Sequence, residues 1–286
     1  MLSEVFGNDM ITWAKAQPDQ PLSRHYPEDV AAEQSGLIWI FVRRAAPFAL
    51  VASDSANRPG HRSNRRKLLI DFYTASTVNG YKVAIALEEL GLPYTVHDLE
   101  LGNLDQKKPE YLKINPNGRI PAIYDRETHT AIFESGACLI YLTEKTGKLT
   151  GADAARRGRV NSWLFLQVSG VGPMQGQANV FLHYFGEDLP RVAARYVNET
   201  KRLYGIVNDR LGVSKWLADD YSIADIAMFP WMIISEYANV SLDDYPNIKA
   251  WTERMHARPA VQRGLAVPPK REIKDRAAAV QAILQR

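Results

Sequence analysis

Hydrophobic and polar positions follow two different periods in residues 67–150. Leu68–Tyr73 is an almost continuous apolar run, which indicates a buried strand, and Tyr94–Leu99 indicates a second strand. Between them, Tyr81–Leu90 carries apolar residues at helical spacing, and Gly91 is placed to end that helix. Strand, helix and strand in this order predict a β-α-β unit.

A tight turn and two short strands complete the predicted sheet. Asn117-Gly118 is a turn pair, and the strand Ile120–Tyr124 follows it with Pro121 near its start. Thr130–Phe133 is a short partner strand, and a helix is expected over about residues 134–145. This order predicts a small mixed sheet with helices packed on it.

The pattern from about residue 154 onward is helical. Apolar residues recur at helical spacing over residues 192–211. Ser222–Asp225 has the spacing of a capping box, with Asp in the place of the usual Glu or Gln, before an apolar helix. Pro230 inside that helix predicts a kink or an early end, and Asp244-Tyr245-Pro246 opens another helix. The second half of the chain is therefore expected to be all-helical.

These patterns divide the chain into four parts. Residues 67–150 are expected to form an α/β domain, and residues 151–270 a helical bundle. Residues 1–66 lack sustained periodicity and end in a basic polar stretch typical of a linker, so we expect a poorly ordered extension; residues 271–286 form a tail. The extension is a targeting segment, a partner-binding arm or an artefact of an assigned start, and these alternatives stay open.

Composition and charge narrow the class of protein. The 286 residues suffice for two ordinary domains, and 46% apolar with 23% charged residues is typical of a globular protein. The net charge of +3 is too small to indicate a nucleic-acid partner. The longest apolar stretch, residues 36–53, is split by Arg43-Arg44, so we expect no membrane partner or span.

Cysteine and histidine usage argues against disulfides and metals. Cys138 is the single cysteine of the sequence, which leaves no internal disulfide and no multi-cysteine metal site. The six histidines show no pair at metal-ligand spacing. We therefore expect a metal-free protein of a reducing compartment, the cytoplasm. Acidic residues in the extension weaken a mitochondrial-presequence interpretation, although targeting to an organelle stays an open alternative.

The turn Ser76–Gly80 lies between the first strand and the first helix and carries a hydroxyl, an amide and a glycine. Unpaired backbone N–H groups and the positive end of the helix dipole suit an anion at such a turn. The turn contains no cysteine and no Ser-His or Cys-His pair. Any chemistry there must activate a group brought in from outside, which points to a bound thiol cofactor.

Three motifs resemble those of cytosolic glutathione transferases, over roughly residues 68–267. Asn115–Ile123, NPNGRIPAI, resembles the family's N-P-x-G-x-[IV]-P-x-[IL] segment. Glu134-Ser135 resembles its glutamyl-binding motif, and Ser222–Asp225 its S-x-A-D box. The resemblance implies a thioredoxin-like domain of order β-α-β-α-β-β-α followed by a helical bundle, and a homodimer.

A subgroup is also indicated. Thr77-x-Asn79-Gly80 and the segment 163–177 resemble the bacterial nu-class proteins and the related fungal proteins typified by the yeast nitrogen-regulator prion. The nu class implies glutathione as co-substrate and reduction of a small disulfide, with transferase, peroxidase and detoxification activities as further expectations. Bound glutathione would attack the disulfide and a second glutathione would resolve it, so no protein cysteine is needed.

Two alternatives to an enzyme follow from the same resemblance. The first is a non-catalytic regulator with the glutathione-transferase fold, as in the yeast relative, whose Asn-rich tail is absent here. The hydroxyl of Thr77 suits contact with a thiol, which favours the enzyme. The second is a purely structural domain, which the presence of every binding motif disfavours.

The resemblance also implies which residues hold glutathione. Glu134 would accept the amine, and Ser135 would hold the glutamyl carboxylate, although both also suit a plain helix start. Ile120-Pro121 would form a cis bond that exposes the backbone of Ile120 to the cysteinyl part. Gln106 matches a contact near the glycyl end, against the alternative of a solvated loop amide. Arg119 would add charge there, against the alternative of an exposed surface arginine.

Thr77 and Asn79 are the implied catalytic pair that contacts the thiol. A free thiol with a pKa of about 8.5 is mostly protonated at neutral pH. Lowering that pKa by about two units takes roughly 2.7 kcal/mol. One hydrogen bond to the anion together with the helix dipole lies in that range. Lys82 in the first helical turn adds positive potential, although it opposes the dipole. The alternative is that Thr77 and Asn79 only cap the helix.

Several other reactive or aromatic side chains are expected to be structural. Tyr73 lies at the end of its strand, too far back for a catalytic tyrosine, and Cys138 falls inside a helix as a buried small residue. Four aromatic residues suit either a wall for a hydrophobic co-substrate or the core: Trp163, Phe165, Phe181 and Tyr184.

Overall fold

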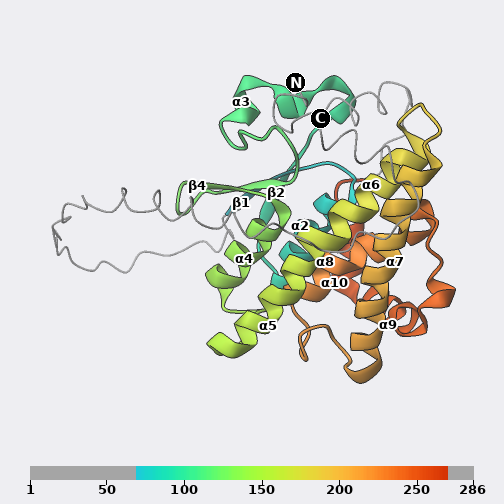
Figure 1. Cartoon of the computed structure of the whole chain (residues 1–286). Coiled ribbons are helices and arrows are strands. Elements are labelled where there is room, and N and C mark those ends of the chain that lie inside the picture. Colours follow the sequence, from blue (N-terminus) through green and yellow to red (C-terminus); the bar gives the residue numbers. More distant parts are fainter. Residues whose placement is uncertain (1–68, 270–286) are drawn as a thin grey trace, which may run out of the picture. The chain divides into compact units, whose positions relative to one another are not determined.

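The computed structural model describes residues 69–269, and its first part is a four-stranded mixed sheet (Figure 1). The strands have the order β2-β1-β3-β4. β1 and β2 are parallel, because the helix α2 crosses over between them, whereas β3 is antiparallel to both β1 and β4. The elements are β1 (Ile70–Thr74), α2 (Val78–Leu90), β2 (Tyr94–Asp98), α3 (Pro109–Leu112), β3 (Ala122–Asp125), β4 (Thr130–Phe133) and α4 (Ser135–Thr146).

This element order confirms the predicted thioredoxin-like fold, with small shifts in the element boundaries. β3 begins at Ala122 and not at Ile120, because Pro121 has no N–H to contribute to the ladder. α2 begins at Val78, three residues before the predicted start, because Thr77 caps it. It ends where expected, at a left-handed Gly91 whose N–H bonds to the last helical carbonyls.

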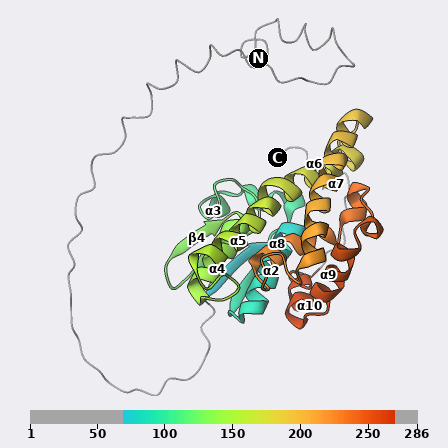
Figure 2. The ribbon, with the colours of Figure 1, turned by 60° about the horizontal axis from the view of Figure 1, so that its bottom comes forward.

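The remaining part of the chain is helical, as predicted, and α8 lies at its centre (Figure 2). Every residue of α8 is buried, and the predicted capping box between Ser222 and Asp225 is present. Pro230 lies inside α8, which ends two residues later, in agreement with the predicted early end. The helices are α5 (Ala154–Phe165), a π-helix (Leu166–Val171), α6 (Gly172–His183), α7 (Pro190–Val213), α8 (Ile223–Met232), α9 (Pro246–His256) and α10 (Pro259–Leu265), with short 3-10 turns at Leu101–Asn103, Asp105–Lys107, Ser235–Ala238 and Leu242–Asp244.

One continuous hydrophobic core joins the sheet to the helices. Phe72 of β1 and Ile123 of β3 are register partners, and both are fully buried with Leu87 of α2 and Leu139 of α4. α2 also contacts α8 and α10, so the core continues into the helical part. The domain limits at residues 150 and 151 stay a prediction. The extension of residues 1–66 and the tail of residues 271–286 lie outside the described residues.

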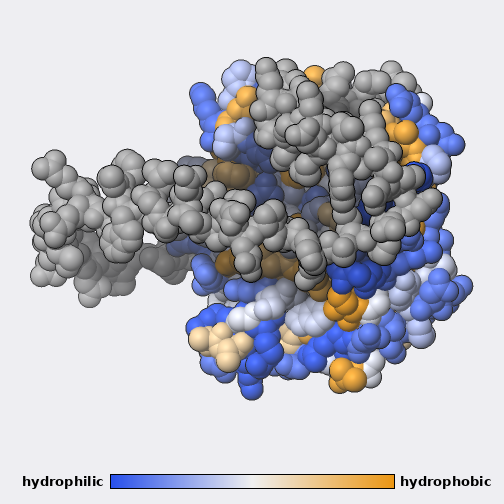
Figure 3. Space-filling view, viewed as in Figure 1, coloured by the Kyte–Doolittle hydropathy of each residue, from blue (hydrophilic) through white to orange (hydrophobic). Residues whose placement is uncertain are grey.

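The described surface in Figure 3 is largely hydrophilic, with hydrophobic residues scattered singly or in small groups. Phe133 and Phe165 are exposed large hydrophobic residues, at 38% and 55%. Within residues 69–269, no helix is long and apolar enough to cross a membrane.

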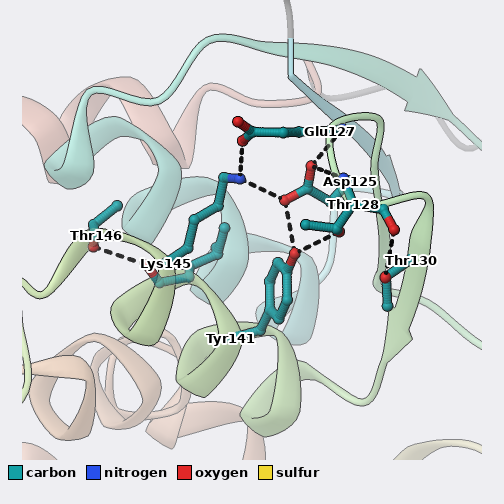
Figure 4. A network of polar contacts seen from close by, with 8 residues as sticks. Asp125, Glu127, Thr128, Thr130, Tyr141, Lys145 and Thr146 are labelled. Atoms are coloured by element: carbon teal, nitrogen blue, oxygen red, sulfur yellow. Dashed lines mark hydrogen bonds and ion pairs between the residues drawn. The ribbon is translucent and has the colours of Figure 1, made fainter. Parts of the chain in front are cut away.

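A buried polar network fixes α4 to the β3–β4 hairpin (Figure 4). The carboxylate of Asp125, with no exposed side-chain surface, accepts from Lys145 Nζ at 2.9 Å and from Tyr141 OH at 2.7 Å. Its other oxygen accepts from the N–H of Glu127 at 2.8 Å. β4 leads directly into α4, so the network and the short connection together fix the first residue of α4, Ser135.

Replacing Lys145 by Met is expected to lower the free energy of unfolding by about 2 kcal/mol at neutral pH, since the buried carboxylate would lose its cation. Burial alone would raise the pKa of Asp125, but the bonds from Lys145 and Tyr141 outweigh burial and hold that pKa below its ordinary value. The stabilisation is therefore present above a pH of about 4 and is lost as the pH falls through the lowered pKa.

Urea denaturation near neutral pH and in acid measures both effects. Lys148→Met is the matched control, because this exposed lysine has no ion pair among the described residues. An equal destabilisation of Lys145→Met at both pH values would contradict the role of the ion pair.

Candidate active site

The register of the sheet brings the predicted site segments to one edge. Tyr73 near the end of β1 pairs with Ala122 at the start of β3, and Ala122 pairs with Phe133 at the end of β4. The turn after β1, the Ile120-Pro121 peptide before β3 and the Glu134 residue after β4 therefore lie at the same edge. The Ile120-Pro121 bond is cis, as the resemblance implied.

Thr77 caps α2. Its Oγ1 accepts from the N–H of Gly80 at 3.2 Å, which is the alternative role considered for this residue. The cap uses only one lone pair of the hydroxyl, whose hydrogen stays available to donate to a bound anion. Gly80 is required here, because a Cβ on it would lie 2.4 Å from Thr74 Oγ1 and 2.5 Å from the carbonyl oxygen of Ala75.

Asn79 reaches across to the helical part. Its Oδ1 accepts from Trp231 Nε1 of α8 at 3.3 Å. Because the indole N–H occupies the amide oxygen, the NH₂ group of Asn79 is left to donate elsewhere. Trp231 is itself fixed: its carbonyl accepts from Gln175 Nε2 at 2.9 Å, and Tyr204 OH donates to Gln175 Oε1 at 2.9 Å. Asn79 is therefore held by a buried network and does not merely cap α2.

Glu134 and Ser135 form the start of α4. Glu134 has a left-handed φ of 70°, which a residue with a side chain adopts only when its surroundings hold it there. Its exposed carboxylate accepts from Asn117 Nδ2 at 3.2 Å, so the turn before β3 and the start of α4 are joined. Ser135 is 8% exposed, and its N–H lies in the first turn of α4, where helix N–H groups have no helical partner.

The buried side chain of Lys82 ends next to Ser135. Lys82 is the fifth residue of α2 and points into the interior, with only 2% of its surface exposed. Its Nζ donates to Gln167 Oε1 at 2.6 Å and to Ser135 Oγ at 3.5 Å, and it lies 5.8 Å from the centre of the Trp231 ring. Burial lowers the pKa of Lys82 to about 7, partly opposed by the field of Glu134.

Gln106 is buried without a hydrogen-bond partner. It lies in the 3-10 turn Asp105–Lys107, is 1% exposed, and neither Oε1 nor Nε2 bonds to any described residue. This contradicts the alternative of a solvated loop amide. Its backbone carbonyl would lie 3.0 Å from a Cβ on Gly118, so the turn packs against the segment that leads into Ile120. A buried amide without a partner is costly, and a bound ligand or a water molecule is the usual way in which such a group is satisfied.

Two segments of the chain match two known domain families. Residues 79–145 match the glutathione S-transferase N-terminal domain, and residues 181–259 match the glutathione S-transferase C-terminal domain. The disulfide-bond oxidoreductase YfcG of Escherichia coli is 43% identical over 203 residues, which cover 69% of this chain and 94% of that protein. The chain belongs to the glutathione S-transferase family.

Solved structures of other members resemble this one. A glutathione transferase from Pseudomonas putida, with one glutathione disulfide bound per subunit, is 39% identical with a TM-score of 0.67, covering 72% of this chain and 94% of that chain. The nitrogen regulation fragment of the yeast prion protein Ure2p is 33% identical with a TM-score of 0.66, covering 69% and 96%. Both the enzyme-like and the regulator-like resemblance of the sequence are therefore represented among its relatives.

Several side chains named in the sequence analysis do not take part in the contacts described for Thr77, Asn79, Lys82, Glu134 and Ser135. The side chain of Arg119 is exposed and forms no ion pair within residues 69–269; its carbonyl accepts from Asn115 Nδ2 at 2.6 Å. Tyr73 stacks on His97 with 4.4 Å between ring centres, and burial raises its pKa. Cys138 is fully buried, and burial raises the pKa of its thiol far above the ordinary range. These positions of Tyr73 and Cys138 agree with the structural roles predicted for them.

The four aromatic residues lie in different surroundings. Phe165 is 55% exposed, and Phe181 stacks on Tyr196 with 5.5 Å between ring centres. Tyr184 OH bonds to Tyr237 OH at 2.7 Å, and Trp163 packs against the core. Trp163 therefore belongs to the core, whereas Phe165 lies on the surface.

Sequence reasoning missed the roles of Gln167 and Trp231. Gln167 lies in a motif that resembles the nu class, but its spacing gives no sign that Lys82 is its partner. The π-helix at Leu166–Val171 places it, and such helices occur often at functional sites. The sequence did carry one sign of the role of Trp231. It lies next to Pro230 in an otherwise apolar helix, and a buried indole N–H needs a hydrogen-bond acceptor.

Gln106→Leu is expected to raise the free energy of unfolding by about 1 kcal/mol, because it removes a buried amide that has no partner. Gln175→Leu is the matched control: this glutamine is equally buried, but both its amide atoms are hydrogen-bonded, so its loss should destabilise. Urea denaturation without ligand measures both. Destabilisation by Gln106→Leu as large as that by Gln175→Leu would contradict the description of Gln106.

Proposed function

We propose that this protein is a glutathione-dependent disulfide reductase in which bound glutathione supplies the reactive sulfur. The observation that carries the proposal is the turn before α2, where the hydroxyl of Thr77 and the NH₂ group of Asn79 both retain hydrogens to donate. The sole cysteine is buried within α4 and is unsuited to be a nucleophile. The likeness to a disulfide-bond oxidoreductase, and to a transferase with bound glutathione disulfide, supports the same activity.

The proposed arrangement of glutathione uses the edge of the sheet described above. Ser135 and the first N–H groups of α4 hold the glutamyl α-carboxylate, and Glu134 accepts from the amine. The backbone of Ile120, before the cis Pro121, pairs with the cysteinyl part. The buried side-chain amide of Gln106 forms a hydrogen bond with the glycyl end of glutathione, and the exposed Arg119 adds a positive charge there. All of these contacts are proposals for this chain.

The proposed chemistry balances with two molecules of glutathione. The bound thiolate, stabilised by Thr77, Asn79 and the positive end of the α2 dipole, attacks one sulfur of a small disulfide. This forms a mixed disulfide and releases the other half as a thiolate, which takes up a proton. A second glutathione thiolate attacks the mixed disulfide, so glutathione disulfide and a second thiol leave. A peroxide or another electrophile could accept the same thiolate attack.

The candidate alternative is a non-catalytic regulator that binds glutathione or a partner. The likeness to the nitrogen regulation fragment of Ure2p favours it. The donors at Thr77 and Asn79 favour the enzyme, because a binding protein has no need to stabilise a thiolate. Retention on a glutathione column with no turnover of any small disulfide would support the regulator.

Thr77→Ala and Asn79→Ala are each expected to lower kcat/KM with glutathione and 2-hydroxyethyl disulfide by about tenfold to a hundredfold, since each removes one donor to the thiolate. Thr77→Ser keeps the hydroxyl and should retain most of the rate. Affinity for S-hexylglutathione, which has no free thiol, should change little in all three. Unchanged rates in both alanine variants would overturn the thiol role.

We also propose that the protein is a cytoplasmic homodimer, as expected from its family. The exposed Phe133 and Phe165 are apolar surface of the kind that a subunit interface covers. Sizing chromatography with light scattering is expected to give twice the mass of the chain. Replacing both phenylalanines by serine should shift the mass toward that of one chain, and a monomer for the unchanged protein would contradict the proposal.

A further inference from the structure

Lys82 is a buried ammonium group without a carboxylate partner. It is 2% exposed, and no Asp or Glu of the described residues lies within ion-pair distance of its Nζ. Its hydrogen-bond partners, Gln167 Oε1 and Ser135 Oγ, are both neutral. A buried cation without an anion is costly, and structures retain one chiefly where something else supplies the charge.

The elements packed around Lys82 offer it few charges. α4 contributes neutral Ser135, preceded by Glu134, whose carboxylate is exposed and acts only through its field. The π-helix contributes neutral Gln167, and α8 contributes the face of Trp231. The first turn of α2 itself has no acidic residue. A negative charge from outside the described residues would therefore favour the protonated form of Lys82.

We propose that Lys82 is the buried counter-cation of the carboxylate that binds at Ser135. It is a positioning residue that acts through Ser135: its ammonium group donates to Ser135 Oγ, which leaves the serine O–H free to donate to the ligand. Hydrogen bonds in such a chain strengthen one another in a low dielectric. The inference rests on the proposed function, because it takes the carboxylate to be the glutamyl α-carboxylate of glutathione.

A coupling between ligand binding and protonation follows. Without ligand, burial lowers the pKa of Lys82 to about 7. A bound carboxylate favours the ammonium form and raises this pKa, so binding takes up a proton above neutral pH. The raised pKa belongs to the bound state, so affinity is greatest below neutral pH and weakens as the pH rises. If only the protonated form binds, affinity falls by about tenfold at one pH unit above the free pKa.

Isothermal titration calorimetry with S-methylglutathione tests this coupling, because this ligand has no thiol that titrates. Measurements between about pH 6 and pH 8, in buffers of different ionisation enthalpy, give both the affinity and the protons taken up. The unchanged protein is expected to take up a proton near the upper end and to bind about tenfold more weakly there than at pH 6.

Lys82→Met keeps an unbranched side chain as far as Cε and removes the ammonium group. This variant is expected to bind about tenfold more weakly at pH 6, with no proton uptake and a flat pH profile. The same ligand without its glutamyl α-carboxylate should bind the variant and the unchanged protein equally. Proton uptake or a pH profile in Lys82→Met equal to that of the unchanged protein would overturn the role of Lys82.

Gln167→Glu keeps the proposal testable should Lys82→Met fail to fold, as thermal denaturation would reveal. It retains the lysine and supplies a carboxylate at the place of its 2.6 Å acceptor. Its binding of S-methylglutathione is expected to be independent of pH, and persistent proton uptake would count against Lys82. Absence of binding by the unchanged protein at every pH would instead refute the proposed function.

Discussion

The burial of α2 between the sheet and the helical part is the constraint on which the rest of this structure depends. The five consecutive residues Val83–Leu87 are all fully buried, so the helix has no polar side in this stretch. α10 approaches so closely that a Cβ on Gly264 would lie 2.6 Å from the Cα of Ile85. A helix enclosed in this way cannot shift without disturbing the sheet and the bundle together, since interiors are close-packed.

This enclosure decides how the site is built. The polar residues near the start of α2 cannot all turn to water, so other elements must satisfy them. Asn79 accepts a hydrogen bond from Trp231 of α8. Lys82 donates to Gln167 of the π-helix and to Ser135 of α4. The α/β part therefore carries the turn that we propose binds the thiolate, while the helical part orients side chains within that turn. Changes in the packing of α8 would reach the turn through the indole N–H of Trp231 and through the contact between α8 and α2.

The sequence predicted those features that depend on neighbouring residues. The end of α2 at Gly91 and the capping box at Ser222 follow from short segments. The fold class follows from the order of elements together with the family resemblance, and the cis bond before Pro121 was expected from that resemblance alone. The sequence did not predict partners far apart in the chain, such as Lys82 with Gln167, because spacing within a helix says nothing about what packs on it. The burial of Gln106 was missed for the same reason: a 3-10 turn rich in charged residues looks solvated until its packing against the Gly118 turn is known.

Three polar groups of the candidate site lack a full set of partners among the described residues. The amide of Gln106, the Nε2 of Gln167 and the ammonium of Lys82 each cost folding free energy as they stand. Groups like these persist in a fold when their cost is recovered in another state, and binding of a ligand with complementary charge provides such a state. In the proposed arrangement, glutathione would meet this need with its two carboxylates, one near Gln106 and one near Ser135 and Lys82. The imbalance of the ligand-free site would then be a source of binding selectivity, since a ligand lacking either carboxylate leaves one buried group without a partner.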